Sequence, residues 1–167
     1  KQPKALNPIR IGDVIIGRGN GTFIIAEAGV NHNGNLQRAF DLIKLAKQCG
    51  ANCIKFQTFK AKEVVTLKAP KAPYQLETTD KKESQYEMLK KLEFSFDQFQ
   101  QIQAKCKEIN LTFLSTPYNF RDADELEALG VEAYKIASGQ LVEHPFLEYV
   151  AKKGAPIILS TGMATMK

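Results

Sequence analysis

Residues 23–29 read Phe-Ile-Ile-Ala-Glu-Ala-Gly, a short apolar run that ends in a potentially reactive side chain, and four later segments repeat this pattern. The later segments are Cys-Ile-Lys-Phe-Gln-Thr (53–58), Thr-Phe-Leu-Ser-Thr-Pro (112–117), Tyr-Lys-Ile-Ala-Ser-Gly (134–139) and Ile-Ile-Leu-Ser-Thr-Gly (157–162). Short apolar runs bounded by turn residues are typical of strands buried in a parallel sheet. We therefore predict an α/β protein with five such strands.

Stretches with helical periodicity separate these segments, so the order along the chain is strand, helix, strand. Such crossovers make neighbouring strands parallel, and the carboxyl ends of parallel strands lie on one face of the sheet. In (β/α) barrels, that face carries the active site. The polar residues that we expect to meet there are Glu27, Lys55, Gln57, Thr116, Lys135, Ser138 and Ser160.

Capping residues mark the predicted helices. Asn35 precedes an apolar periodicity that Gly50 closes, and Ser95 precedes a second one. Further helices are predicted over residues 84–92, 122–129 and 145–153. Residues 60–83 are charged, contain prolines and show no sustained period, so we predict a long loop that overhangs the site.

The N-terminal residues predict a hairpin. Residues 11–16 and 22–26 are apolar, and the glycine-rich segment 17–21 between them is typical of a turn. We expect the opening strand to close the floor of a barrel. This divides the chain into a lead-in at residues 1–22 and a catalytic barrel portion at residues 23–167.

Five strands are three fewer than a (β/α)8 barrel contains, and such barrels typically need about 250 residues. We therefore predict a TIM barrel of which this chain holds the hairpin and about the first five strands. An open doubly wound sheet is the alternative, but the glycine-rich turn expected after its first strand is missing.

Composition narrows the function classes. The net charge of +5 comes from 23 basic and 18 acidic residues that are dispersed along the chain, whereas a nucleic-acid site needs a clustered stripe. No apolar run approaches the roughly 20 residues that cross a bilayer. Three cysteines are an odd number and lie in helical or strand patterns, so we expect free thiols and a cytoplasmic protein without nucleic-acid or membrane partners.

The set of strand-end residues is suited to an anion. Two ammonium groups and several hydroxyls can hold a phosphate by charge and hydrogen bonds, although single lysines also extend along apolar surface and single hydroxyls also cap turns. Glu27 follows four apolar residues, so we expect a buried carboxylate with a partner: a metal-bound water, a substrate hydroxyl or Lys55. His32 is expected to be a hydrogen-bonded turn residue and no metal ligand.

Six runs in order resemble the sialic acid synthase family, which includes N-acetylneuraminate, legionaminate and pseudaminate synthases. The runs are Ile-Ala-Glu-Ala-Gly-Val-Asn-His-Asn-Gly (25–34), Lys-Phe-Gln-Thr-Phe (55–59), Glu-Ser-Gln-Tyr-Glu-Met-Leu-Lys-Lys-Leu (83–92), Leu-Ser-Thr-Pro (114–117), Lys-Ile-Ala-Ser-Gly (135–139) and Leu-Ser-Thr-Gly-Met-Ala (159–164). The resemblance covers residues 9–167 and corresponds to the N-terminal barrel portion of the family.

The resemblance implies a barrel followed by a small antifreeze-like domain, outside this chain. It implies condensation of phosphoenolpyruvate with an N-acylated hexose, N-acetylmannosamine or a diacetylated bacterial hexose, to a nine-carbon 2-keto sugar acid with C–O cleavage and phosphate release. A divalent metal, commonly manganese with magnesium as the alternative, would be held by histidines on later strands. The full-length protein is expected to be a homodimer.

Residue roles follow position by position from the same resemblance. Glu27 and Gln57 are the implied catalytic residues, and none of the metal ligands lies in this chain. The implied substrate-binding residues are Lys55, Thr116, Tyr118, Lys135, Ser138, Gln140 and Ser160. Gln140 stands where several relatives have a carboxylate, and Thr78 or Thr79 where some have a sugar-binding asparagine, so these positions depart from the family pattern.

Two other functions remain open at this point. A Schiff-base aldolase would use Lys55 or Lys135 as a nucleophile, and a covalent adduct with substrate would distinguish it. A non-catalytic phosphosugar-binding module would bind phosphoenolpyruvate without turnover, since a fold does not determine a function.

Overall fold

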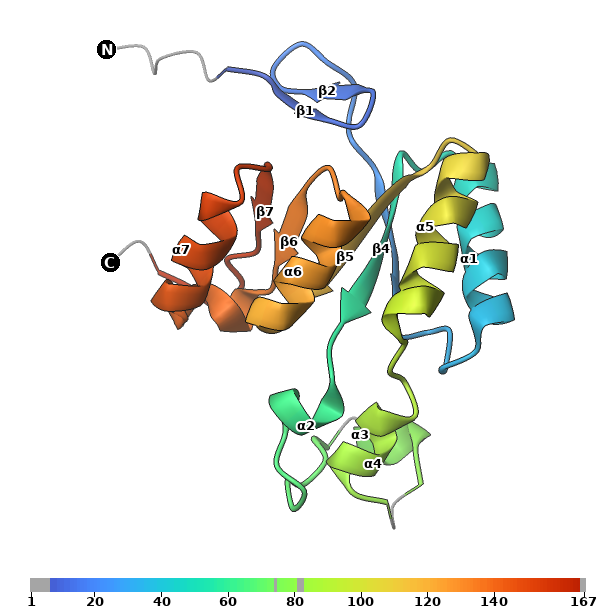
Figure 1. Cartoon of the computed structure of the whole chain (residues 1–167), viewed down its shortest axis with the longest axis vertical. Coiled ribbons are helices and arrows are strands. Elements are labelled where there is room, and N and C mark those ends of the chain that lie inside the picture. Colours follow the sequence, from blue (N-terminus) through green and yellow to red (C-terminus); the bar gives the residue numbers. More distant parts are fainter. Residues whose placement is uncertain (1–6, 74, 81–82, 166–167) are drawn as a thin grey trace.

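The computed structural model describes residues 7–73, 75–80 and 83–165. Five of the described strands run parallel in two groups, with the order β3-β4-β5 in one group and β6-β7 in the other (Figure 1). Strand β5 contacts β6, so the two groups are neighbours. The five strands are β3 (Ile25–Gly29), β4 (Cys53–Thr58), β5 (Thr112–Pro117), β6 (Tyr134–Ile136) and β7 (Ile157–Leu159). All five predicted strands are therefore present.

Helices connect these strands along one side of the sheet (Figure 1). They are α1 (Leu36–Gln48), α5 (Phe96–Glu108), α6 (Phe120–Leu129) and α7 (His144–Lys152), with a 3-10 helix η1 (Ser138–Val142) after β6. The Asn35 side chain accepts a hydrogen bond from the Arg38 N–H, and Ser95 forms a capping box, as predicted. Helix α6 begins two residues earlier than predicted because Asn119 caps it.

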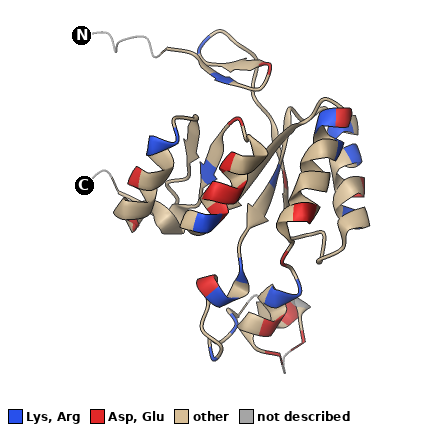
Figure 2. Ribbon diagram, in the orientation of Figure 1, with Lys and Arg blue, Asp and Glu red and all other residues tan. Residues whose placement is uncertain are grey.

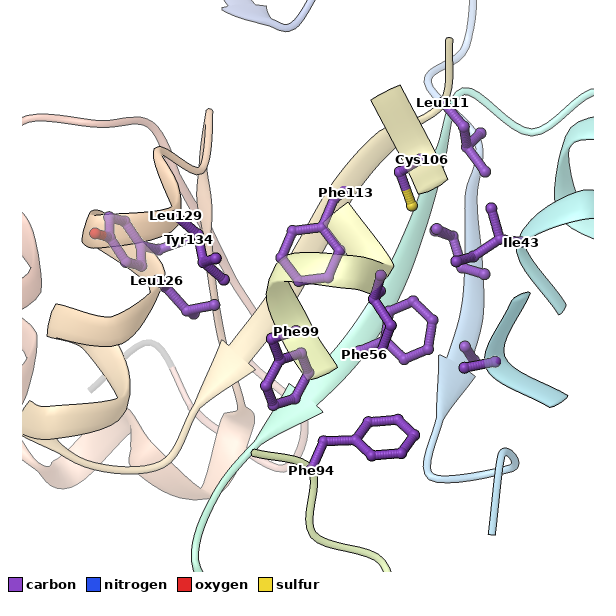
Figure 3. Packing of buried hydrophobic residues seen from close by; sticks show 14 of the residues in the cluster. Ile43, Phe56, Phe94, Phe99, Cys106, Leu111, Phe113, Leu126, Leu129 and Tyr134 are labelled. Carbon is purple, nitrogen blue, oxygen red and sulfur yellow. The ribbon is translucent and has the colours of Figure 1, made fainter. Parts of the chain in front are cut away.

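Alternation along the strands divides the buried residues into two clusters. Outward residues such as Phe56 and Phe113 pack beneath α1 and α5, where Phe94 and Phe99 join them (Figure 3). Inward residues near the amino ends form a smaller cluster of Ile11, Cys53, Leu114 and Ala133. The strand residues nearer the carboxyl ends of the inward face are polar, which leaves that end of the barrel for chemistry.

The hairpin is present, but its predicted position was wrong. Strand β1 (Ile9–Ile11) pairs antiparallel with β2 (Val14–Ile16), so the turn is at Gly12 and Asp13 rather than at residues 17–21. Gly12 has a φ of +59°, a conformation that glycine adopts without strain. Ile11 is 2% exposed and packs against the amino-terminal ends of the strands, so the hairpin covers the barrel floor as expected. Residues 1–6 of the lead-in lie outside the described residues.

The overhanging segment contains more helix than predicted. Helices α2 (Ala61–Val64) and α3 (Gln75–Thr78) are single turns inside the predicted loop, and α4 (Gln85–Lys90) follows with a Ser84 capping box. The segment lies beyond the carboxyl end of β4 (Figure 1). Within the described ranges, none of the helices has the length and apolar character of a transmembrane span.

Candidate active site at the carboxyl ends of the strands

Strand register brings the predicted residues side by side. Glu27 pairs with Lys55 across β3 and β4, and Gln57 pairs with Thr116 across β4 and β5. In β4 the inward Lys55 and Gln57 are half-buried, whereas the outward Phe56 between them is buried. Lys135 has the equivalent inward position in β6, between two buried residues. The period of two along each strand thus delivers these side chains to one face.

Glu27 accepts a hydrogen bond from the Lys55 ammonium group in an ion pair. The expectation of a buried Glu27 was wrong, because its side chain is 51% exposed and that of Lys55 only 13%. Glu27 is in regular register with Lys55, and the register of β3 and β4 shifts after it, between Glu27 and Gly29. A Cβ atom at Gly29, whose φ is +50°, would lie 3.0 Å from Glu27 Oε1 and 3.5 Å from Gln57 Nε2, so the two predicted catalytic side chains are close.

The two lysines form an electropositive centre in a partly dehydrated place. Burial, and then repulsion from Lys135, lowers the pKa of Lys55 to about 8. Burial also lowers the pKa of Lys135, whose ammonium group donates to the Ile136 carbonyl oxygen at 2.7 Å. A partly buried cation that a second cation repels gains from binding an anion, so this centre is suited to a phosphate or carboxylate.

Hydroxyl residues come from three neighbouring strand ends. Thr116 is 4% exposed, and a Cβ atom at Gly162 would lie 3.4 Å from Ser138 Oγ, which places the β6 and β7 end loops against each other. The Ser160 N–H donates to the Ile136 carbonyl oxygen at 3.1 Å, extending the pairing of these strands. The structure therefore brings the hydroxyl residues of the predicted anion site to one rim.

Gln140 differs from the other predicted residues because both polar atoms of its side-chain amide are hydrogen-bonded to the protein backbone. Its Nε2 donates to the Pro117 carbonyl oxygen at 3.1 Å, and its Oε1 accepts from the Ala137 N–H at 3.2 Å. The side chain is 4% exposed. Gln140 thus joins the end of β5 to the loop after β6, and its predicted contact with substrate stays a prediction.

A cleft of about 1020 Å³ opens between the strand ends and the overhanging segment, and neither Lys55 nor Lys135 is among its described lining residues. Gln57 and Tyr118 line it from the barrel, and the Tyr118 ring meets Phe59 edge to face with centroids 6.0 Å apart. Thr79 lines the opposite wall, whereas the side chain of Thr78 lies outside the described part of the chain. The cleft has the size of a small-molecule site.

Sequence reasoning missed most of the side chains in this cleft. Asn31 and Asn33 line it from the turn after β3, and Gln75 and Gln85 line it from the overhanging segment. The position of Asn31 and Asn33 directly after a strand could have indicated their role, since that is where barrel sites are built. No comparable signal marked Gln75 and Gln85, which lie in a segment without periodicity.

The described residues do not form a metal site by themselves. No group of three His, Cys, Asp or Glu side chains comes together among them. His32 is 1% exposed, accepts a hydrogen bond from the Gly34 N–H at Nδ1 and stacks on Phe94, and burial lowers its pKa to about 4. This confirms the prediction of a hydrogen-bonded turn residue. Acidic and basic residues are scattered over the helices (Figure 2).

Comparison with known proteins decides the family, because a family model described as the NeuB family matches residues 42–167. The chain belongs to the NeuB family. It is 48% identical over 145 residues to an N,N'-diacetyllegionaminic acid synthase of Campylobacter jejuni, covering 87% of this chain and 43% of the relative. It is 38% identical over 144 residues to the human N-acetylneuraminate-9-phosphate synthase, covering 86% of this chain and 40% of the relative.

Structures of NeuB-family relatives have the same fold. An N-acetylneuraminic acid synthetase from Leptospira borgpetersenii superposes with a TM-score of 0.81 at 32% identity, over 96% of this chain and 51% of that one. The Bacillus subtilis spore coat polysaccharide biosynthesis protein SpsE superposes with a TM-score of 0.75 at 33% identity, over 96% of this chain and 41% of that one. These matches confirm the predicted fold class. The chain spans about half the length of these relatives or less.

Proposed function

We propose that this chain supplies the phosphoenolpyruvate-binding part of a synthase that condenses phosphoenolpyruvate with an N-acylated hexose. The product would be a nine-carbon 2-keto sugar acid, with phosphate released by C–O cleavage. The observation that carries the proposal is the partly buried pair Lys55 and Lys135, at a rim whose neighbouring strand ends carry hydroxyl residues, in a NeuB-family chain.

The lysines would hold the donor. Phosphoenolpyruvate has a phosphate and a carboxylate, and Lys55 and Lys135 would neutralise this charge while Thr116, Ser138 and Ser160 donate hydrogen bonds to the oxygens. Holding both groups fixes the enol carbon relative to the acceptor, which lowers the entropic part of the barrier. In the condensation, the enol carbon would form the new C–C bond with the aldehyde carbon, and the aldehyde oxygen would take up a proton from solvent water to become a hydroxyl.

Glu27 would act on water in the second half of the reaction. Formation of the C–C bond leaves a cationic centre at the carbon that bears the phosphate, and water adds there as its proton passes to Glu27. The resulting adduct collapses with cleavage of the C–O bond and loss of phosphate. The exposure of Glu27 gives water access, and the neighbouring Gln57 amide can orient that water. Full activity of a Glu27→Gln variant would contradict this role.

The charge of the cleft supports an uncharged acceptor. Asp80 and Glu83 face the cleft from the overhanging segment and Lys91 is the basic residue among its described lining, while several amides and a phenol complete it. Glu83 is paired with Lys91 and with Lys71 behind it, so Lys91 is not left over for a sugar phosphate, and the oxygens of this wall provide acceptors for sugar hydroxyls. We therefore favour N-acetylmannosamine or a diacetylated hexose over a hexose phosphate.

The metal, the dimer and the location rest on the family resemblance. We propose a dependence on manganese, or alternatively magnesium, with ligands outside residues 1–167. We also propose that the full-length protein is a cytoplasmic homodimer. Removal of metal with a chelator should abolish turnover and re-addition should restore it, and light scattering of the full-length protein tests the dimer.

The decisive experiment measures phosphate release from phosphoenolpyruvate by the full-length protein with manganese. The panel contains N-acetylmannosamine, its 6-phosphate and diacetylated bacterial hexoses. Release that requires both metal and an unphosphorylated sugar supports the proposal and identifies the acceptor. A preference for the 6-phosphate would overturn the assignment of the acceptor, and saturable binding without any turnover would favour a binding module.

The lowered pKa of Lys55 keeps a Schiff-base aldolase as the second candidate, because such a nucleophile must lose its proton. Borohydride reduction in the presence of substrate would trap a covalent adduct on Lys55 or Lys135 if this candidate were correct. The synthase requires no covalent adduct, so mass spectrometry of the reduced protein separates the two functions.

A further inference from the structure

Lys71 is a buried cation in the overhanging segment, with a side chain only 1% exposed. Its ammonium group donates to Thr79 Oγ1 at 2.9 Å, to the Asp80 carbonyl oxygen at 2.7 Å and to Glu83 Oε1 at 3.0 Å. An ammonium group has three hydrogens to donate, so each is matched by an acceptor. A charge this deeply buried is tolerated only where such partners compensate for lost hydration.

The three partners of Lys71 share a second property, which is that all of them line the cleft. Thr79, Asp80 and Glu83 face the cleft, whereas Lys71 lies behind them and is not part of the described lining. Glu83 also forms an ion pair with Lys91, a further cleft residue. One buried cation therefore holds together the face that we call the acceptor wall, defined by these four cleft residues.

Further hydrogen bonds connect the chain around Lys71 to Gln75 and Gln85, which line the cleft beside the acceptor wall. Gln75 Oε1 accepts from the Ala72 N–H at 2.8 Å and from Gln85 Nε2 at 3.4 Å. The Gln85 N–H donates to the Ala69 carbonyl oxygen at 3.4 Å. Each of these bonds either joins residues close in sequence or is 3.4 Å in length, whereas Lys71 joins three wall residues at once. Loss of its charge should therefore loosen the wall more than loss of any other single contact.

The acceptor wall is separate from the anion centre. The hydrogen-bond acceptors described above for Lys55 and Lys135 lie in the barrel strands, whereas those of Lys71 are Thr79, Asp80 and Glu83. A change at Lys71 should consequently alter the cleft wall and leave the lysine pair intact. This separation makes the contribution of Lys71 measurable.

We infer that Lys71 is a positioning residue for acceptor binding: it holds Thr79, Asp80 and Glu83 in the geometry that recognises the hydroxyls of the acyl hexose. The inference rests on the proposed function for the identity of the acceptor. It assigns to Lys71 no contact with either substrate and no part in the bond-making steps.

The test compares Lys71→Met in the full-length protein with Lys68→Met, a matched control at an exposed lysine of the same segment. We expect Lys71→Met to raise the KM for the acceptor sugar roughly tenfold, because small displacements of positioning groups are costly. The KM for phosphoenolpyruvate should stay within about twofold, as for distant independent sites. Lys68→Met should behave as wild type.

Hydrogen exchange supplies a readout that does not depend on activity. Lys71→Met should exchange faster than wild type in residues 83–92, with the barrel strands unchanged; the milder Lys71→Gln, which retains two donors, should lie between them. Unchanged exchange, an unchanged acceptor KM, or an equal rise in both KM values would overturn the inference. If wild type shows no turnover with any sugar, the proposed function fails, while hydrogen exchange still tests whether Lys71 anchors the wall.

Discussion

Binding of phosphoenolpyruvate should weaken as the pH rises from 7 to 9, because Lys55 loses its proton in this range. The free protein has a pKa of about 8 at Lys55, lowered by burial and by Lys135. A bound anion favours the charged ammonium group, so binding raises this pKa. The affinity is therefore highest at pH values below the pKa of Lys55 in the free protein, and it falls as the pH rises through that pKa.

The magnitude follows from the fraction of Lys55 that is charged, 1/(1 + 10^(pH − 8)). That fraction falls from about 0.9 at pH 7 to about 0.1 at pH 9, so the dissociation constant should rise roughly tenfold if only the charged form binds. The phosphate of the ligand has a second pKa of about 6 and is ionised throughout this range. The pH dependence of the dissociation constant therefore comes from titration of the protein and not of the ligand.

Isothermal titration calorimetry of the full-length protein measures this effect, and buffers with different ionisation enthalpies show proton uptake on binding near pH 8. Lys55→Arg keeps its charge to high pH, so its affinity should be nearly constant between pH 7 and 9, even if it is weaker overall. Lys44→Met, at an exposed position on α1, should retain the slope of wild type. An affinity of wild type that is equal at pH 7 and 9, or a tenfold fall in Lys55→Arg, would refute the reasoning.

Three further changes test the site and its supports. Gly34→Ala should destabilise the protein by more than about 2 kcal/mol, because φ is +71° and the new Cβ would clash with the Lys91 carbonyl oxygen. Gly50→Ala, with φ +79° and open space, should cost only about 1 kcal/mol in denaturant unfolding. Glu27→Gln should lower kcat by about 100-fold while phosphoenolpyruvate still binds in calorimetry; a wild-type kcat would contradict its role. Gln140→Leu should lower the free energy of unfolding by about 2 kcal/mol in thermal unfolding, because it leaves the Ala137 N–H and the Pro117 carbonyl oxygen without their partner. An unchanged stability would show that water replaces the amide.

Much of the fold and part of the site could be predicted because their causes are local. Helix starts at Asn35 and Ser95 depend on a side chain that bonds to a backbone N–H three residues later, and this is visible in the sequence. Alternation in each strand decides which side chains share a face, so Lys55 and Gln57 could be placed together from their spacing. Parallel order then brought Lys135 to the same rim.

Other features were decided only when distant segments met. The position of the hairpin depends on the packing of Ile11 against Cys53 and Leu114 at the barrel floor. The burial of Gln140 depends on its hydrogen bond to the Pro117 carbonyl group, 23 residues away. The sequence by itself determined the strands, the caps and the list of polar strand ends, because these follow from local bonding and periodicity. The tertiary structure alone decided the pKa of Lys55 and the role of Lys71, because burial and charge contacts depend on residues far apart in the chain.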